Sequence, residues 1–355
     1  MIIGTCGFCS TGSSAVSDYL KEFDENQVLD DMEFTIPYRP DGLLDLEYHL
    51  VQNPCRDDGS SIAIPRFRRL MKRQNRSFHK KYGISLDQLQ SNVDDFINQL
   101  VQFRWYGTRR SDTELYPSNF YFYIGNLVMK RRVIPWINTK LGRCVDMYPY
   151  RDLEVSVNPP TFTQASKQFV KNLLSFMGGD FTKNIVLDQP FIGDDPLKTF
   201  HFYDNPKAIV VDRDPRDNYL FTKKMLYKTG KYIPVDTVEN FVKYYRLLRD
   251  GRPYKNDSDK ILRMHFEELV YDYDVATSKI RQFCELGSNP HPLTIFDPQV
   301  SMPNTQLFLR FPEFAKDISY IEKELPEYLF DFDKYPRPTL KEEMFEGKSP
   351  LNKRR

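Results

Sequence analysis

Hydrophobic and polar positions at the start of the chain follow a strand–loop–helix–strand order. Residues 1–6 are mostly apolar and predict a buried strand, and residues 12–23 carry apolar side chains at helical spacing. Residues 27–36 predict a second strand, which Pro37 ends. Because a strand, a helix and a second strand in this order begin a parallel sheet, the pattern favours an α/β fold.

The same alternation returns after residue 160, where six further segments carry strand or helix patterns. They are a helix at 164–177 capped by Thr163, a strand at 183–190, a strand–turn–helix unit at 207–226, an amphipathic helix at 238–250, a strand with a following turn at 260–269 and a helix at 274–286. The stretch between the two halves lacks this rhythm and predicts a mostly helical insertion. We expect a single domain over 1–355, composed of the opening segment 1–36, the insertion 37–160, the second half 161–290 and a C-terminal segment 291–355 that wraps the surface.

Composition restricts the compartment and the partners. The 355 residues carry a net charge of +1, so no overall field favours nucleic acid or an anionic membrane, and no nucleic-acid-binding module is recognisable. No run of about 18 apolar residues predicts a membrane span, and Met1-Ile2-Ile3 is too short for a secretory leader. Five cysteines fit a reducing compartment, and no histidine pairs with cysteine at zinc-site spacing. We expect a cytoplasmic protein without a metal.

The stretch CGFCSTGSS at residues 6–14 permits two interpretations. Cys6 and Cys9 have the C-x-x-C spacing of a thiol–disulfide enzyme, but only five residues precede Cys6, so the framework that normally comes before such a motif is missing. If the stretch is not a redox motif, Cys6 and Cys9 are small side chains that line a tight loop. The alternative is a phosphate-binding loop, G-x-x-x-x-G-S-S, in which Gly7 and Gly12 let the backbone approach a ligand closely.

The phosphate interpretation accounts for more of the loop. Ser13 and Ser14 lie in the first turn of the following helix, where free N–H groups and the positive end of the helix dipole attract an anion. The lysine of a nucleotide-hydrolysing P-loop is replaced by Ser13, which disfavours a kinase that uses Mg-ATP. We therefore expect a P-loop-type parallel sheet flanked by helices.

A second motif, IVVDRDPRDNYLF, occupies residues 209–221. Asp214 can cap the following helix, Pro215 suits its first position, and Asp217 adds an acid to its first turn. Arg213 has no such structural need. At the carboxyl edge of a parallel sheet it would face a ligand crevice, where its guanidinium can bind phosphate through two hydrogen bonds. The alternative is a salt bridge from Arg213 to Asp217 or Asp188.

Together the two motifs resemble the sulfotransferase family that uses 3′-phosphoadenosine 5′-phosphosulfate (PAPS) as donor, in its bacterial carbohydrate type. Residues 10–14, STGSS, match four of the five positions of that family's K/R-[ST]-G-[ST]-[ST] loop, and residues 213–217 match the first half of its R-[ND]-P-R-D-x-x-x-S motif. Segments 184–190 and 265–286 are similar to further family elements. The resemblance covers residues 1–36 and 160–290.

The resemblance implies a PAPS co-substrate, no metal, and a set of nucleotide-binding residues. These are Gly7, Ser10, Thr11, Gly12, Ser13 and Ser14 for the 5′-phosphosulfate, and Arg213, Asp217 and Thr222 on the 3′-phosphate side. Two positions depart from the family. Its loop cation falls on Ser10, and its closing serine falls on Phe221. Lys223, Lys224 and Arg66 are candidates to supply the missing positive charge.

The base and the acceptor are implied less directly. Family members that act on glycans carry a K-E-x-H-F-F-like segment on the second strand, with its glutamate as the base, and Asp31 aligns with that glutamate. Glu33 lies two residues on, so strand alternation would place both side chains on one face. The alternative is a solvated strand end. The acceptor would be a hydroxyl of a glycan or glycolipid, with possible peripheral membrane contact.

Basic and aromatic residues of the insertion are candidates to meet that acceptor. The basic run 66–81 would attract an acidic glycan or form a solvated helix face. Trp105, Trp136, Tyr121 and Tyr123 would stack on sugar rings or belong to the core. A noncatalytic nucleotide-binding protein of the same fold and a P-loop kinase remain the alternatives in other functional classes, and the sequence fixes no oligomeric state.

Overall fold

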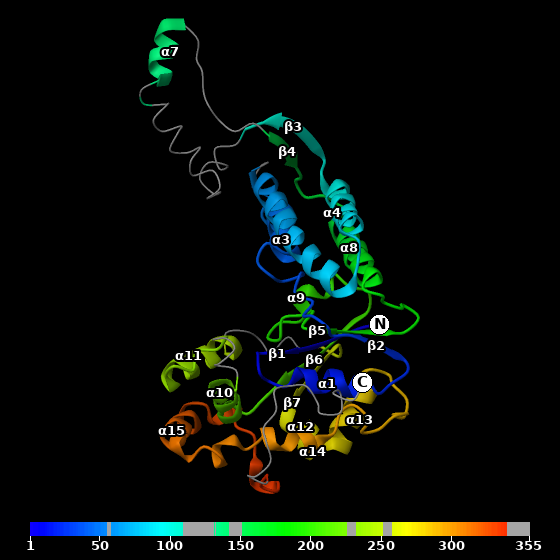
Figure 1. Cartoon of the computed structure of the whole chain (residues 1–355), viewed down its shortest axis with the longest axis vertical. Coiled ribbons are helices and arrows are strands. Elements are labelled where there is room, and N and C mark those ends of the chain that lie inside the picture. The colour runs from blue at the N-terminus through cyan, green and yellow to red at the C-terminus, as the bar shows by residue number, and fades with distance from the viewer. Residues whose placement is uncertain are drawn as a thin grey trace. The chain divides into compact units, whose positions relative to one another are not determined.

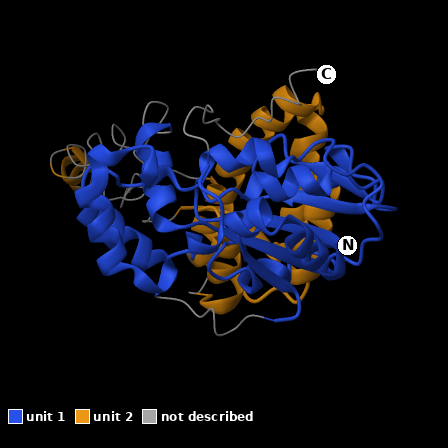
Figure 2. Ribbon diagram, turned by 90° about the horizontal axis from the view of Figure 1, so that it is seen from below, with its two compact units in different colours: residues 1–38, 174–355 blue, residues 39–173 orange. Residues whose placement is uncertain are grey.

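The structure is a computed structural model, and it describes residues 1–54, 58–108, 131, 133–141, 151–225, 232–250 and 258–338. The chain divides into two compact units (Figure 2). The first contains residues 1–38 and 174–355, and the second contains residues 39–173. Each unit is described by itself below.

A five-stranded sheet is the centre of the first unit, and all of its described strand pairs are parallel. Its order is β2 (Asn26–Leu29), β5 (Asn184–Asp188), β1 (Ile2–Gly7), β6 (Pro206–Asp212) and β7 (Ile261–His265). β1 lies in the middle of the sheet, with β5 and β6 on its two sides. The fold class predicted from the sequence, an α/β fold with a parallel sheet flanked by helices, is confirmed.

Helices pack against the sheet, and further helices lie beside one end of it (Figure 1). In chain order they are α1 (Ser13–Leu20), α9 (Leu197–Phe200), α10 (Pro215–Lys224), α11 (Val238–Arg249), α12 (Phe266–Tyr271), α13 (Tyr273–Phe283), α14 (Pro298–Ser301) and α15 (Ala315–Glu324). Short 3₁₀ turns at 302–304, 307–309, 312–314, 326–328 and 332–334 connect the last part of the chain.

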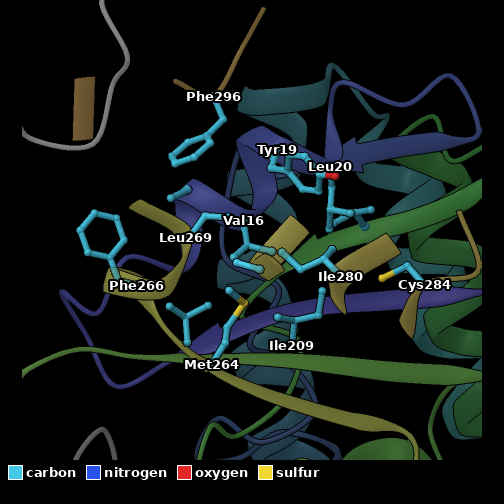
Figure 3. Close-up of a cluster of buried hydrophobic side chains, with 14 of the residues drawn as sticks. Val16, Tyr19, Leu20, Ile209, Met264, Phe266, Leu269, Ile280, Cys284 and Phe296 are labelled. Carbon is cyan, nitrogen blue, oxygen red and sulfur yellow. The ribbon is translucent and has the colours of Figure 1, made fainter. Parts of the chain in front are cut away.

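The main hydrophobic core lies between the sheet and α1, α12 and α13 (Figure 3). The apolar face that the sequence predicted for α1 supplies Val16, Tyr19 and Leu20, all of which are buried against sheet residues such as Ile209 and Met264. Burying side chains of this size contributes about 1.5–3 kcal/mol each. This core therefore fixes the position of α1, and with it the loop that precedes α1.

A second hydrophobic cluster joins α10, α11 and α15. Tyr219, Phe241, Tyr245 and Ile321 are buried in it, and the rings of Tyr219 and Phe241 have centroids 5.1 Å apart. α10 begins where the sequence predicted. Asp214 is its N-cap and accepts a hydrogen bond from the backbone N–H of Arg216, while Pro215 occupies the first helical position.

The second unit is mostly helical, as the sequence predicted for the insertion. Its elements are α2 (Leu43–Glu47), a π-helix (Tyr48–Gln52), α3 (Asp58–Tyr82), α4 (Leu86–Leu100), β3 (Phe103–Gly107), α7 (Ile134–Leu141), β4 (Arg151–Val155) and most of α8 (Phe162–Phe176). β3 and β4 pair antiparallel. Phe67, Phe96 and Phe169 from α3, α4 and α8 form the centre of the unit, with Phe96 stacked on Phe169 at 4.8 Å.

Two predicted boundaries are wrong. Thr163 lies inside α8, which begins at Phe162, so it does not cap that helix. β2 ends at Leu29 instead of residue 36. β2 is an edge strand that pairs with β5 alone, and the pairing stops at Leu29 and Leu187. Residues Asp31 and Glu33 therefore do not lie on a strand, and the alternation argument that placed them on one face does not apply.

Among the described helices, none has both the length and the apolar character needed to cross a membrane.

Candidate functional site

The loop between β1 and α1 exposes a row of backbone donors. Cys9, Ser10 and Gly12 have φ angles of 68°, 58° and 89°, so the chain turns through left-handed conformations before α1 begins at Ser13. The N–H groups of residues 9–14 donate no hydrogen bond to any described residue. Consecutive free N–H groups at the start of a helix form an anion-binding site.

Both glycines of the loop are required by space, and Gly12 is required by its backbone angle as well. A Cβ atom on Gly12 would lie 2.5 Å from Cδ2 of Phe266, and one on Gly7 would lie 2.2 Å from Oγ1 of Thr11. These contacts are far shorter than van der Waals separation. The close approach of Phe266 to Gly12 places an aromatic ring directly beside the loop.

Polar side chains hold the loop in this shape. Thr11 is buried, and its Oγ1 accepts a hydrogen bond from the N–H of Phe8 at 3.1 Å, so Thr11 supports the loop from within. Gln189 accepts from the N–H of Gly7 at 3.2 Å and donates to Oγ of Ser13 at 3.0 Å. Asn218 of α10 donates to the carbonyl of Cys9 at 3.0 Å.

The loop and Arg213 line one cavity of about 810 Å³ in the first unit. Ligand sites for small molecules usually have volumes of about 300–1,000 Å³. Its lining residues come from four parts of the unit: Cys9, Ser10, Gly12, Ser14, Ala15 and Asp18 from the loop and α1; Glu33 after β2; Arg213, Phe221 and Tyr232 around α10; and Phe266, Ile295, Phe296, Asp297, Val300, Ser301 and Asn304 from α12 onward.

Arg213 is buried at the wall of this cavity. Its Nη1 donates to the carbonyl of Ser10 at 3.1 Å, Nη2 donates to the carbonyl of Asn304, and Nε has no partner among the described residues. Its guanidinium lies over the ring of Phe221, 4.7 Å from the centroid. Burial lowers the pKa of Arg213, although Asp217 and other nearby carboxyls oppose that shift.

Asp217 and Thr222 do not line the cavity. The carboxylate of Asp217 accepts hydrogen bonds from the N–H groups of Gln306 and Leu307, both at 2.7 Å, so it anchors the C-terminal segment. Neither Asp217 nor Asp188 forms an ion pair with Arg213 in the described structure. Thr222 is buried, and its Oγ1 has no partner among the described residues.

A group of carboxyls lies beside the loop at the other end of the cavity. Glu33 and Asp18 line the cavity, whereas Asp31 does not. Asp188 is the last residue of β5, and burial together with the charges of Glu33 and Asp30 raises its pKa to about 7. Lys21 pairs with Asp18 and Asp30 at 2.8 and 2.6 Å. From the sequence, Asp188 is expected either to line the crevice or to pair with Arg213; it is not among the described lining residues, and no ion pair with Arg213 is present.

The cations proposed from the sequence to replace the loop lysine are engaged elsewhere. Lys223 contacts Tyr219 and Asp317, and Lys224 pairs with Glu313 at 2.7 Å; neither lines the cavity. Arg66 belongs to the second unit, where it pairs with Asp41 at 2.5 Å. Among the described lining residues, Arg213 is therefore the sole arginine or lysine.

The thiols of the loop do not fit a redox site. Burial raises the pKa of Cys6 and, to a smaller extent, that of Cys9. Thiol–disulfide enzymes need the opposite shift, because the thiolate is the reactive form. No group of three or more His, Cys, Asp or Glu side chains within the described residues could hold a metal ion.

Candidate acceptor-binding residues lie in the second unit. The basic run is part of α3, but Arg68 pairs with Asp94 and Glu154 inside the unit, so part of its charge is compensated. Trp105 and Trp136 are exposed. Tyr121 and Tyr123 lie outside the described residues.

Comparisons with known proteins give structural likeness alone. The sequence matches no protein-family model and no curated protein. A sulfotransferase domain from the curacin biosynthetic pathway is 11% identical, with 83% of this chain and 77% of that chain covered and a TM-score of 0.38. The sulfotransferase STF9 from Mycobacterium avium is 12% identical, with 94% and 76% covered and a TM-score of 0.36. The function is therefore argued from the geometry of the site.

Proposed function

We propose that this protein transfers a sulfuryl group from PAPS to a hydroxyl of a carbohydrate or glycoconjugate. One observation carries the proposal: the free N–H groups of the glycine loop and the buried guanidinium of Arg213 border the same cavity of about 810 Å³. Two separate anion-binding devices in one cavity suit a ligand with two separate anionic groups, such as an adenylate phosphorylated at both its 3′ and 5′ positions.

Each part of the cavity has a role in this proposal. The loop amides with Ser13 and Ser14 hold the 5′-phosphosulfate, and Arg213 holds the 3′-phosphate. Phe266 and Phe296 offer an apolar wall to the purine ring. Sulfuryl transfer, like phosphoryl transfer, depends mainly on positioning and on stabilisation of the charge that develops on the leaving oxygen.

A base must take the proton of the attacking hydroxyl. A pKa near 7 suits this task because the group is partly ionised at neutral pH and still accepts a proton readily. Asp188 has such a pKa, and Glu33, which lines the cavity, is one of the charges that raise it. We assign the base to this pair: Glu33 lines the cavity, and Asp188, which like Asp31 is not a lining residue, is the titrating group because its pKa is raised to about 7.

A second function is favoured by the composition of the loop. Because Ser10 replaces the expected cation and no lysine lines the described cavity, the leaving oxygen would be stabilised by amides and the helix dipole alone. A noncatalytic protein that binds the nucleotide would have the same cavity without needing that charge. It differs from the enzyme in binding adenosine 3′,5′-bisphosphate without transferring sulfate.

The test combines binding with transfer. Melting temperature is followed with adenosine 3′,5′-bisphosphate and with Mg-ATP, since a ligand at 100 times its Kd stabilises by about 2.7 kcal/mol. Transfer of ³⁵S from labelled PAPS is then measured over a panel of glycans. The enzyme proposal expects a shift with the bisphosphate, lost in Arg213→Ala and kept in Lys224→Ala, together with labelled product. Binding without product leaves the noncatalytic protein, and a shift with Mg-ATP alone would identify a kinase.

A further inference from the structure

Arg213 belongs to a cluster of buried ionisable side chains. From the start of α10 the cluster includes Arg213, Asp214, Arg216 and Asp217, and from α12 it includes Glu267. All five are buried, the two arginines at 3% and 9% exposure and the three acids at 0%. Three carboxyls thus face two guanidinium groups in a region from which water is excluded.

Within the cluster, the charges of Arg216 and Asp214 compensate each other. Arg216 donates to both carboxylate oxygens of Asp214, through Nε at 3.0 Å and Nη2 at 2.8 Å. Its remaining Nη1 donates to Glu322 at 2.9 Å. The charge of Arg216 is therefore balanced by these two acids. Arg213 is left with two carboxyls, Asp217 and Glu267, and it hydrogen-bonds neither of them.

Within the group of Arg213, Asp217 and Glu267, two atoms have no hydrogen-bond partner among the described residues. They are Nε of Arg213 and Oε2 of Glu267. The other oxygen of Glu267 accepts a hydrogen bond from the N–H of Asp214 at 3.1 Å. An ionised carboxylate with a bare oxygen in a buried position is strongly disfavoured, whereas a protonated carboxyl there is not. The geometry thus favours a proton on Glu267, whereas both oxygens of Asp217 already accept backbone N–H groups.

The electrostatic surroundings agree with that arrangement. Burial raises the pKa of Glu267 well above its usual range, and Asp217 and Asp214 raise it further. Burial likewise raises the pKa of Asp217 to about 7, while Arg213 lowers the pKa of both groups. Two other titratable side chains face the pair: His265, whose Nδ1 lies 3.9 Å from Oε2 of Glu267, and Tyr271, whose pKa is raised by burial and by both acids.

An anion bound at Arg213 changes this balance. It neutralises the guanidinium that holds the carboxyl pKa values down, and it adds a negative charge beside them. We propose that anion binding at Arg213 is coupled to the uptake of one proton by Asp217 and Glu267, so that these two buried carboxyls set the affinity of the site. The proton comes from solvent and forms an O–H bond on a carboxyl, and no other bond changes.

The direction of the pH dependence follows from this linkage. While one proton is taken up on binding, the affinity falls up to tenfold for each pH unit above the pKa of Asp217 in the free protein, about 7. Below that pH the proton is already present and the affinity levels off. The inference rests on the proposed function only in taking the bound anion to be a phosphate of the donor nucleotide.

The test uses two probes, adenosine 3′,5′-bisphosphate and inorganic sulfate. Sulfate does not titrate near neutral pH, so its pH dependence reports the protein alone. Calorimetry in two buffers of different ionisation enthalpy gives the protons taken up. The variants are Glu267→Gln, which keeps an oxygen for the N–H of Asp214, and Glu267→Gln combined with Asp217→Asn. Glu313→Gln, an exposed acid paired with Lys224, is the control.

At a pH well above the pKa of Asp217, we expect about one proton taken up by the unmodified protein and by Glu313→Gln, a smaller number by Glu267→Gln, and no protein proton by the double variant, with a flat sulfate profile. Bisphosphate binding with equal proton uptake in all variants overturns the inference and leaves the proposed function standing. Sulfate binding with the expected proton uptake, but without bisphosphate binding, overturns the proposed function alone. Failure of both anions to bind overturns both.

Discussion

The cavity has two kinds of group that would bind an anion, the backbone N–H groups at its loop end and the guanidinium of Arg213, which donates to the loop carbonyl of Ser10. At the loop end the donors are backbone N–H groups of residues 9–14, and side chains serve mainly to shape the loop. At the Arg213 end the donor is one buried side chain with acids nearby, the single arginine or lysine among the described lining residues. Backbone donors persist through side-chain replacement, so we expect the loop to bind an anion with serine in place of a cation. At the Arg213 end, replacement of the side chain removes the donor itself.

The two ends also differ in what they cost the fold. The loop uses left-handed backbone angles at Cys9, Ser10 and Gly12, each a local strain of about 1–3 kcal/mol for a residue with a side chain. Arg213 requires removal of a charge from water, at several kcal/mol, offset by the carbonyls of Ser10 and Asn304 and by the nearby carboxyls. Substitutions at the two ends therefore separate backbone effects from charge effects.

The largest expected effect is at the loop. Gly12→Val combines an unfavourable φ of 89° with a Cβ only 2.5 Å from Phe266, so we expect loss of anion binding and a decrease of about 3 kcal/mol or more in the free energy of unfolding. Gly178→Val is the matched control, with a φ of 90° and no atom within 4 Å of the added Cβ. Urea unfolding of both variants measures the difference. Equal losses would mean that the contact with Phe266 is irrelevant.

Removal of the proposed base comes next. Asp188→Asn should lower kcat by about 100-fold or more with little change in nucleotide affinity, since general bases contribute 10²–10⁴-fold. In the unmodified protein the rate should rise with pH through about 7, as Asp188 becomes ionised, and this limb should vanish in the variant. A pH–rate profile shows it. If the rate of Asp188→Asn still rises with pH through about 7, the base is another group.

Asp188→Asn should also change how the free energy of unfolding depends on pH. Because the pKa of Asp188 is raised from 3.8 to about 7, the native protein holds a proton there that the unfolded chain releases. This contribution to stability is complete below about pH 4 and is lost as the pH rises to 7, with a slope of at most about 1.4 kcal/mol per pH unit. Asp188→Asn should flatten that part of the pH–stability curve.

At the Arg213 end we expect a smaller loss of binding. Arg213→Met should raise the Kd for adenosine 3′,5′-bisphosphate by about 30- to 150-fold, corresponding to about 2–3 kcal/mol for a charge-assisted contact. Arg213→Lys should recover little of it, because one ammonium cannot replace a planar guanidinium that donates to two separate carbonyls. Calorimetry at one pH gives the Kd values. Full recovery with lysine would contradict a role for guanidinium geometry.

The smallest effect is expected at Thr222. Its buried Oγ1 has no partner among the described residues, so Thr222→Val should change stability by less than about 1 kcal/mol, and in the stabilising direction. If the hydroxyl binds the nucleotide, as the resemblance in the sequence implies, the Kd rises several-fold in the same variant. A Kd within twofold of the unmodified protein removes Thr222 from the site.

Features that depend on neighbouring residues in the sequence were easier to predict than features that depend on contacts between distant residues. The β1–loop–α1 unit and the cap of α10 depend on neighbours within a few residues, and the sequence shows them directly. β2 was predicted too long because its end is set by β5, more than 150 residues away. Asp217 was assigned to the nucleotide, although it binds the backbone at 306–307. Glu267 was missed because nothing near it in sequence reveals that three other ionisable groups meet it.

The cavity has a consequence for the order in which the protein becomes competent during synthesis. Residues 295–304 form a wall of the cavity, and Asn304 supplies one of the two carbonyls that hold Arg213. Chains fold from their N-terminal side as they leave the ribosome. The loop and the sheet can therefore assemble well before any nucleotide can be captured, and ligand cannot assist the folding of the first three hundred residues.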